Sequence, residues 1–163
     1  MTYRVCFVCT GNICRSPMAE SVFRARTAEA GLDDRVEADS AGTGGWHEGD
    51  GADPRAVRVL AEHGYDSDHT ARQFQASWFA RLDLVIALDS GHLKALRRLA
   101  PTEQDARKVR LLRAYDPAAG DDLDVPDPYY GALDGFEECL EMVEAASEGL
   151  LAAVRAEVEG TAG

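Results

Sequence analysis

The sequence lacks the marks of a secreted or membrane-spanning protein. No apolar run approaches the ~20 residues that a spanning helix needs. The opening residues, M-T-Y-R-V-C, have neither the charged region nor the long apolar stretch of a signal peptide. Cysteine is scarce, and Cys6, Cys9 and Cys14 crowd into one short segment while Cys139 stands alone, which does not suit a disulfide framework. We therefore expect a cytoplasmic protein that works in a reducing compartment without a membrane partner.

Basic residues are also scarce. The chain has 17 Lys and Arg against 29 Asp and Glu, a net charge of −12, and no Lys or Arg lies between Tyr115 and Leu150. Such acidity repels a phosphate backbone, so a nucleic-acid partner is excluded. The four histidines lack metal-ligand spacing, so we expect no zinc site. We also expect no cofactor. A chain of 163 residues is expected to fold as one domain over residues 1–163.

Short apolar runs alternate with helical patterns along the chain. The runs typical of buried parallel strands are Val5–Val8, Val36–Ser40, Leu84–Leu88 and Val109–Leu112. Helices are predicted to begin at three polar residues, Ser16, Asp53 and Ser90. A last helix is predicted from four apolar residues at helical spacing, Phe136, Cys139, Leu140 and Val143. The segment 116–131 is predicted to be a long proline-bearing loop. This alternation predicts an α/β fold with a parallel sheet covered by helices on both faces.

The loop C-T-G-N-I-C-R-S, Cys9–Ser16, directly follows the first predicted strand and runs into a helix. Ligands of such sheets bind at the carboxyl ends of strands, and a helix N-terminus attracts anions. Gly11 and Asn12 tolerate the left-handed backbone that a tight loop needs. Arg15 offers a planar fork to two phosphate oxygens. The loop is therefore predicted to cradle a tetrahedral oxyanion.

Cys9 lies at the base of this predicted cradle. Backbone amides, the helix dipole and Arg15 all favour the thiolate, which is the reactive form of cysteine, and Ser16 can donate its hydroxyl to the sulfur. A thiolate inside a phosphate-shaped loop implies attack on phosphorus and a phosphocysteine intermediate. A cysteine and an arginine at this spacing also occur by chance, and the alternative is a merely buried Cys9. Cys6 and Cys139 are expected to be buried as small hydrophobic residues of the core.

Cleavage of a phosphate ester also needs an acid for the leaving group. The candidate is Asp127 in V-P-D-P-Y-Y, where two flanking prolines restrict the backbone. Tyr129 and Tyr130 follow and are suited to walling a slot for a flat ring. An isolated Asp-Pro pair is, alternatively, an ordinary turn.

These motifs resemble the low-molecular-weight protein tyrosine phosphatase family. C-T-G-N-I-C-R-S-P-M-A-E and D-P-Y-Y carry the resemblance, together with S-A-G-T at Ser40, the following G-G-W-H, and D-P-R-A-V at Asp53. It covers essentially the whole chain. It implies hydrolysis of phosphotyrosine and small aryl phosphates, with Cys9 as nucleophile, Arg15 as phosphate binder and Asp127 as general acid and then base.

The resemblance also implies an architecture and supporting roles. The fold would be a four-stranded parallel sheet of flavodoxin-like order, 2-1-3-4, with the phosphate-binding loop after strand 1 and no metal. Asn12 would be a strained keystone bonded to Ser40, and Ser16 would stabilise the thiolate. The other residues of the phosphate-binding loop would be Thr10, Gly11, Ile13 and Cys14. The rim around the substrate ring would be formed by Trp46, Tyr129 and Tyr130. His69 and Asp89 match positions near the loop, although structural hydrogen bonding explains them equally well. We expect a monomer whose partners are phosphotyrosine-containing proteins and phosphate or other oxyanions.

Several other functions share parts of this pattern. Thioredoxin-coupled arsenate reductases need further cysteines in the middle of the chain, and none lies between Cys14 and Cys139. A phosphocarrier must keep its phosphocysteine, so a hydrolytic Asp127 argues against it. A phosphopeptide-binding module needs no cysteine. A protein-arginine phosphatase branch looks similar but carries threonine at the position of Ile13, whose apolar side chain favours an aryl substrate.

The two thiols of the loop raise a redox hypothesis. Because the loop wraps a single phosphate, Cys9 and Cys14 are expected within the ~4.4–6.8 Å Cα separation of a disulfide. An exposed, reactive Cys9 is prone to sulfenic acid formation, which Cys14 could trap as a reversible disulfide. The alternative, that Cys14 only fills space behind the loop, is equally consistent with the sequence.

Overall fold

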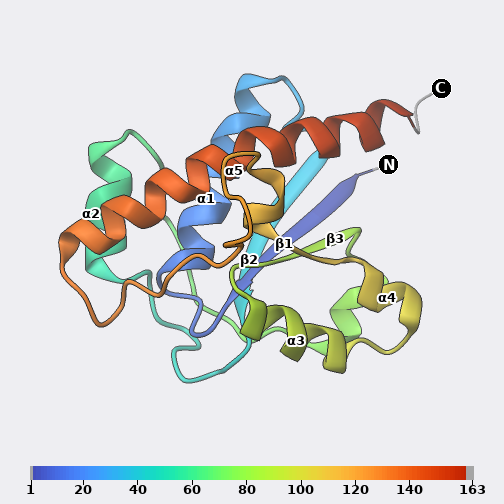
Figure 1. Cartoon of the computed structure of the whole chain (residues 1–163), viewed down its shortest axis with the longest axis horizontal. Coiled ribbons are helices and arrows are strands. Elements are labelled where there is room, and N and C mark those ends of the chain that lie inside the picture. Colours follow the sequence, from blue (N-terminus) through green and yellow to red (C-terminus); the bar gives the residue numbers. More distant parts are fainter. Residues whose placement is uncertain (1, 161–163) are drawn as a thin grey trace.

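The computed structural model describes residues 2–160, and its centre is a four-stranded parallel sheet (Figure 1). The strands are β1 (Tyr3–Cys9), β2 (Val36–Gly42), β3 (Leu84–Ala87) and β4 (Val109–Leu111). They lie in the order β2-β1-β3-β4, and each neighbouring pair is parallel. The predicted α/β class and the order 2-1-3-4 are confirmed.

Helices cover both faces of the sheet. Their bounds are α1 (Arg15–Glu29), α2 (Pro54–Glu62), α3 (Ser90–Leu99), α4 (Glu103–Arg107) and α5 (Leu133–Gly160), with short 3-10 turns η1 (Ala76–Ala80) and η2 (Leu112–Tyr115). One core cluster joins the sheet to α1, α2 and α5, and a second joins it to α3 and η1. Figure 1 shows α5 running across the molecule beside α1 and α2.

The central strand explains why both faces need a cover. Val5, Phe7 and Cys9 of β1 belong to the first core cluster, whereas Cys6 and Val8 belong to the second. Successive side chains of a strand point to opposite faces, so a continuous apolar run is stable only when both faces are buried. The strand that ends at Cys9 is therefore packed from two sides, which fixes the base of the loop that follows it.

One helix start differs from the predicted ones. α1 begins at Arg15 with Cys14 at its N-cap, so the prediction of Ser16 as N-cap is wrong. The Ser16 hydroxyl instead accepts a hydrogen bond from the Asn12 side chain (2.8 Å), a contact that the local Ser-Pro pattern does not reveal. α3 begins at Ser90 as predicted, and its N-cap is Asp89, whose carboxylate accepts from the His92 N–H (2.9 Å). Asp53 caps α2 as predicted.

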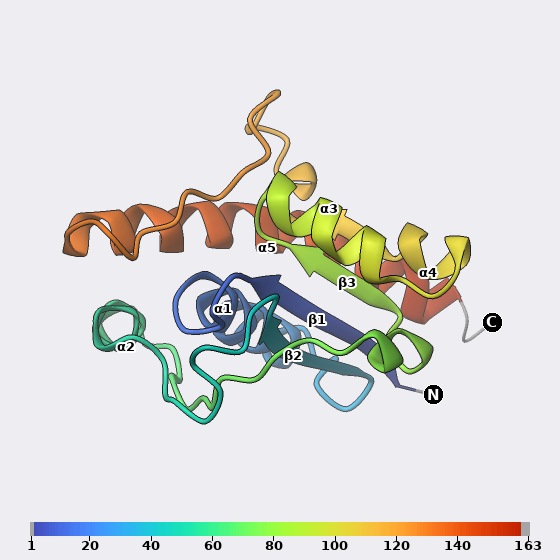
Figure 2. The ribbon, with the colours of Figure 1, turned by 90° about the horizontal axis from the view of Figure 1, so that it is seen from below.

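The segment between η2 and α5 has neither helix nor strand, as predicted for residues 116–131. Figure 2 shows it in orange, rising away from the sheet before it descends to the start of α5. Val125 ties it back to the sheet, since its N–H donates to the Leu88 carbonyl oxygen (2.8 Å) and its side chain is buried. Among residues 2–160 no helix is long and apolar enough to cross a membrane.

Candidate active site

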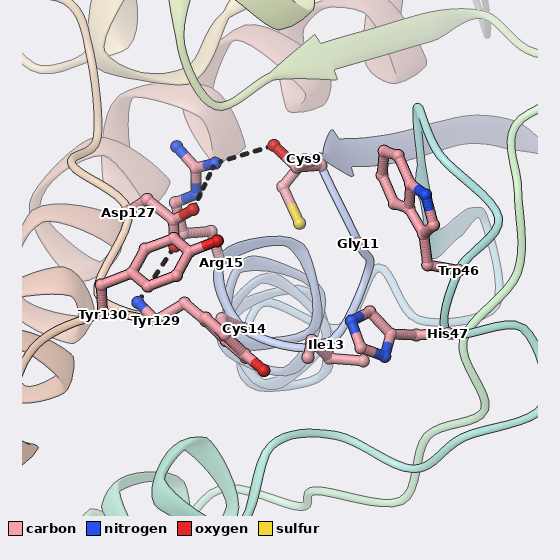
Figure 3. Close-up of a pocket in the computed structure, with 11 residues that line it drawn as sticks. Cys9, Gly11, Ile13, Cys14, Arg15, Trp46, His47, Asp127, Tyr129 and Tyr130 are labelled. Carbon is pink, nitrogen blue, oxygen red and sulfur yellow. Dashed lines mark hydrogen bonds and ion pairs between the residues drawn. The ribbon is translucent and has the colours of Figure 1, made fainter.

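The loop after β1 forms the floor of a cavity of about 310 Å³ (Figure 3). Neighbouring segments hold the loop by its carbonyl oxygens: Thr43 N–H donates to Cys9 (2.8 Å), and Gly44 N–H to Thr10 (3.0 Å). Within residues 2–160 no hydrogen bond is found from the backbone N–H groups of positions 10–14. With the carbonyl oxygens bonded outward, these donors remain available to an oxyanion beside the N-terminus of α1.

Asn12 sets the shape of the loop. Its φ of 60° lies in the left-handed region, where an asparagine is tolerated better than most side chains. Its buried amide donates to Ser16 Oγ (2.8 Å) and to Ser40 Oγ (3.0 Å), and its Oδ1 accepts from the Arg72 N–H (3.0 Å). His69 Nε2 donates to the Asn12 carbonyl oxygen (2.7 Å). These contacts from three other segments hold a backbone conformation that costs on the order of 1 kcal/mol by itself.

The Cys9 sulfur lies at the bottom of the cavity, 2.9 Å from Ser16 Oγ. Asn12 already donates to that hydroxyl, so its single proton is left for an acceptor, and the Cys9 sulfur (2.9 Å) lies nearer to Ser16 Oγ than the Ala41 carbonyl oxygen does (3.3 Å). A hydroxyl that donates to sulfur stabilises negative charge on it. The expectation of an exposed Cys9 is wrong, since the residue is only 3% exposed: β1 and the core bury it, and it opens only into the cavity.

Arg15 is 3% exposed and lies beside Cys9 with its guanidinium fixed on one side. Nη1 donates to Asp89 Oδ2 (2.8 Å) and to the Val125 carbonyl oxygen (2.9 Å), and Nη2 lies 3.3 Å from Thr10 Oγ1. Burial lowers the pKa of Arg15, but Cys9 and Asp89 raise it further, so its pKa lies above the usual value. A buried, permanently charged fork therefore faces the cavity.

His92 is a site residue that the sequence interpretation treated only as an unlikely metal ligand. Its Nε2 lies 2.8 Å from Thr10 Oγ1 and 3.4 Å from Arg15 Nη2. Burial, and next the charge of Arg15, lower the pKa of His92 to about 4, so the imidazole is neutral near pH 7. Nothing local links positions 10 and 92. The available signal was its place in the first turn of a helix that follows β3, the strand beside β1.

Asp127 reaches the cavity from the long loop. Its side chain is 40% exposed, and Oδ1 accepts from the Tyr129 N–H (3.0 Å). Its other oxygen, Oδ2, lies 3.7 Å from Arg15 Nη2. Figure 3 shows Asp127 to the left of the Cys9 sulfur, on the same side as the two tyrosines. A nucleophile, a cation and a carboxyl thus face one small space.

Aromatic side chains form the rim. Trp46 is 75% exposed on one side of the cavity, and Tyr129 with the 90% exposed Tyr130 stands on the other (Figure 3). Gly44 makes room for the indole, since a Cβ built there would lie 1.9 Å from the Trp46 ring. Ile13 and His47 also line the cavity, whereas Asn12 and Ser16, two of the expected loop residues, are buried and do not line it.

The remaining candidates are structural by position. Ser40, buried behind Asn12, donates to Glu20 Oε1 (2.6 Å). All four cysteines are free, and burial chiefly raises the pKa of Cys14 beyond its usual range and that of Cys139 to about 12. In the part of the chain that the structure describes, no group of three or more His, Cys, Asp or Glu side chains is arranged to hold a metal ion.

Comparisons with known proteins show the family of the chain. Residues 4–160 match the family model "Low molecular weight phosphotyrosine protein phosphatase". A low molecular weight protein-tyrosine-phosphatase from Streptomyces coelicolor is 81% identical over 163 residues, which is 99% of each chain. A protein tyrosine phosphatase from Entamoeba histolytica, solved with Hepes in its active site, superposes with a TM-score of 0.91 at 34% identity over 96% of this chain and 99% of its own. A YwlE arginine phosphatase mutant superposes with a TM-score of 0.83 at 30% identity, over 93% and 95% of the two chains.

Proposed function

The chain belongs to the low molecular weight phosphotyrosine protein phosphatase family, and we propose that it hydrolyses phosphotyrosine through a phosphocysteine formed on Cys9. The observation that carries this proposal is the meeting of the Cys9 sulfur, the Arg15 guanidinium and the Asp127 carboxyl in one cavity. The family and the enzyme class follow from the comparisons. The individual residue roles are inferred from the geometry.

Substrate binding uses the cradle and the fork. The phosphate oxygens accept hydrogen bonds from the backbone N–H groups of positions 10–14 and from the guanidinium of Arg15. Asp89 and the Val125 carbonyl occupy Nη1, so the guanidinium is oriented before substrate arrives. Donors that are already in place stabilise the charge of the transition state without reorganisation.

In the first step the Cys9 thiolate attacks phosphorus. The S–P bond forms, the bond between phosphorus and the tyrosine oxygen breaks, and Asp127 donates its proton to the leaving oxygen. A protonated Asp127 is the required starting form, and its exposed side chain at the cavity edge suits contact with the ester oxygen. Ser16 stabilises the sulfur both as thiolate and as the leaving group of the second step.

In the second step water attacks the phosphocysteine. Asp127, now a carboxylate, takes a proton from that water, the S–P bond breaks, and inorganic phosphate and the Cys9 thiolate are released. The same carboxyl therefore serves as acid and then as base, and each turnover returns it to its starting form.

The rim supports an aryl substrate carried on a protein. Trp46 and Tyr130 are too exposed to serve the core, and they stand on opposite sides of the cavity mouth, as walls for a phenyl ring. Phosphoarginine is the second candidate, because a structurally similar solved protein is an arginine phosphatase. The apolar Ile13 in the cavity lining favours phosphotyrosine.

The wider setting is part of the proposal. We expect one phosphatase domain that acts as a monomer in the cytoplasm, on phosphotyrosine-containing proteins, without metal or cofactor and with redox sensitivity at Cys9. Inorganic phosphate and similar oxyanions are expected to occupy the cradle and to inhibit.

The function is tested by hydrolysis of an aryl phosphate in the presence of a chelator. Wild type should turn over unchanged with chelator, whereas Cys9→Ser should be inactive and still bind phosphate or vanadate, because the cradle survives without the sulfur. Activity retained by Cys9→Ser, or lost by wild type on chelation, would contradict the proposal.

A further inference from the structure

Arg55 connects the loop that carries Asp127 to the first turn of α2. Its Nη1 donates to the Gly131 carbonyl oxygen (2.9 Å) and its Nη2 to the Tyr129 carbonyl oxygen (2.9 Å). Arg55 is not among the residues that line the cavity, and the proposed mechanism gives it no part. A charged side chain that binds two carbonyl groups of one loop restricts that loop.

A carboxylate fixes the guanidinium in turn. Asp53 accepts from Arg55 through both oxygens, with Nε 3.0 Å from Oδ1 and Nη2 2.9 Å from Oδ2. The Asp53 N–H donates to the Ile13 carbonyl oxygen of the cradle (2.8 Å). Hydrogen bonding from Arg55 is the main cause that lowers the pKa of Asp53. One continuous set of bonds therefore runs from the phosphate loop, through Asp53 and Arg55, to the loop of Asp127.

Two aromatic rings flank the same group. The Arg55 guanidinium carbon lies 5.6 Å from the centre of the Tyr129 ring and 4.6 Å from that of Phe136. Phe136 is fully buried in α5, so this contact anchors the fork to the core. The planar guanidinium stacks on rings and forks to carboxylates in a way that an ammonium does not.

Tyr129 is bonded both to Arg55 and to Asp127, the proposed acid. The Tyr129 N–H donates to Asp127 Oδ1 (3.0 Å), and the carbonyl of the same tyrosine accepts from Arg55 (2.9 Å). On the other side of Asp127, Val125 is bonded to Leu88 (2.8 Å). Asp127 therefore lies between two anchors in a segment with no helix or strand, and Arg55 is the second anchor.

We propose that the Asp53–Arg55 pair is a positioning device that holds the Asp127 loop over the cradle. It rests on the proposed function of Asp127 as the acid for the leaving group. Arg55 touches neither phosphate nor the reacting atoms. Its effect is to keep the carboxyl within reach of the ester oxygen, so its loss impairs protonation of the leaving group and leaves phosphate binding intact.

A leaving-group series tests this. Arg55→Ala should lower kcat/KM for phosphotyrosine by about tenfold to a hundredfold, the range expected when a catalytic group is displaced. An ester of an acidic phenol, such as nitrophenyl phosphate, should lose much less, and inhibition by inorganic phosphate should not change. The matched control is Arg58→Ala on the same helix, where Arg58 is exposed and forms an ion pair with Glu62 (3.0 Å) on its own helix; it should behave like wild type.

Combination with Asp127→Asn separates positioning from general stability. If Arg55 acts through Asp127, Arg55→Ala should cost almost nothing further in the Asp127→Asn background. An equal fold-loss in both backgrounds, or equal losses along the leaving-group series, would overturn the proposal. If Arg55→Ala unfolds, Arg55→Lys keeps the stem and the charge without the fork, and the same outcomes decide.

The Asp127→Asn variant distinguishes a failure of the proposed acid role of Asp127 from a failure of the positioning role of Arg55. Asp127→Asn alone should slow phosphotyrosine most and the acidic phenol esters least. If it does not, the role of Asp127 fails, whatever Arg55 does. If Asp127→Asn behaves as expected while Arg55→Ala shows no leaving-group dependence, only the positioning role of Arg55 is overturned.

Discussion

Arg15 Nη1 and Asp89 Oδ2 lie 2.8 Å apart, in an ion pair whose arginine is almost fully buried. The pair comes from two different strand ends, since Arg15 opens α1 after β1 and Asp89 caps α3 after β3. Backbone hydrogen bonding from His92 and the side chain of Arg15 lower the pKa of Asp89, against the opposing effect of its burial, which is the largest single influence. Both partners are therefore charged near pH 7, and the direction of the guanidinium is set before any ligand binds.

Because of this ion pair, we expect position 15 to require arginine. Arg15→Lys should lower kcat by about a hundredfold or more, because an ammonium cannot hold Asp89 and two phosphate oxygens at once. Steady-state kinetics with an aryl phosphate measure the loss, and the melting temperature shows whether the variant is folded. Turnover near that of wild type would remove Arg15 from its proposed role.

Ile13 is expected to tune the choice of substrate. Its side chain lines the cavity and presents an apolar surface to a flat ring. Ile13→Thr should therefore raise the efficiency for phosphoarginine relative to phosphotyrosine. The measurement is the ratio of the two kcat/KM values, with Cys9→Ser as the blank for both substrates. An unchanged ratio would mean that Ile13 does not discriminate between them.

His92 should make the protein less stable in acid. Its pKa is about 4 in the folded state against 6.5 for the free side chain, because burial and Arg15 disfavour its charged form. Between pH 6.5 and 4 the unfolded chain therefore binds more protons at this site than the folded one, and stability falls as the pH falls. Above pH 6.5 this contribution is constant.

Denaturant unfolding at several pH values measures this effect. From pH 6.5 to 4.5 the His92 site should remove on the order of 2 kcal/mol from the free energy of unfolding. His92→Gln should lose correspondingly less than wild type over the same interval, whatever its stability at pH 7. Parallel curves for the two proteins would show that His92 does not carry the difference.

Cys14 bears on the redox hypothesis. The thiol is buried and its pKa is raised, first by burial and next by Asp53, which makes a spontaneous thiolate at this position unfavourable. We nevertheless expect mild peroxide to form a reversible Cys9–Cys14 disulfide, because a Cys9 sulfenic acid is attacked by whichever thiol can reach it. Mass spectrometry after peroxide treatment detects the linkage.

Recovery of activity provides the control for that experiment. Wild type should regain its activity with a thiol reductant, and Cys14→Ser should regain much less because its Cys9 is overoxidised. Equal recovery of the two proteins, or no linked peptide in wild type, would leave Cys14 as a residue that only fills space behind the loop.

Local patterns were sufficient to predict the sheet and the cradle. The apolar run that ends at Cys9 predicts a buried central strand, and the Gly11-Asn12 pair predicts the left-handed turn that Asn12 makes with φ 60°. The same local reasoning misassigned Ser16, because a serine before a proline usually caps a helix. Here the helix begins one residue earlier, at Arg15, and the Ser16 hydroxyl instead accepts from the side chain of Asn12, four residues before it.

Residues that act through distant contacts could not be predicted in this way. His92 and Thr10 are separated by 82 positions, and Arg55 and Tyr129 by 74, so no periodicity or spacing joins them. Their meeting depends on the order in which the strands lie and on the path of a loop without regular structure. The D-P-R-A-V motif is part of the resemblance to the phosphatase family, but only the fold shows that its arginine, Arg55, binds the loop of Asp127.

The most direct test of the account is to look for the phosphoryl group on Cys9. Wild type and Asp127→Asn are mixed with an acidic aryl phosphate, quenched within the first turnovers and digested for mass spectrometry. We expect a peptide that carries one phosphoryl group on the Cys9 sulfur, with a higher occupancy in Asp127→Asn because its second step lacks a base. Full turnover with no phosphorylated Cys9 peptide at any quench time, or phosphate found on another residue, would contradict the mechanism.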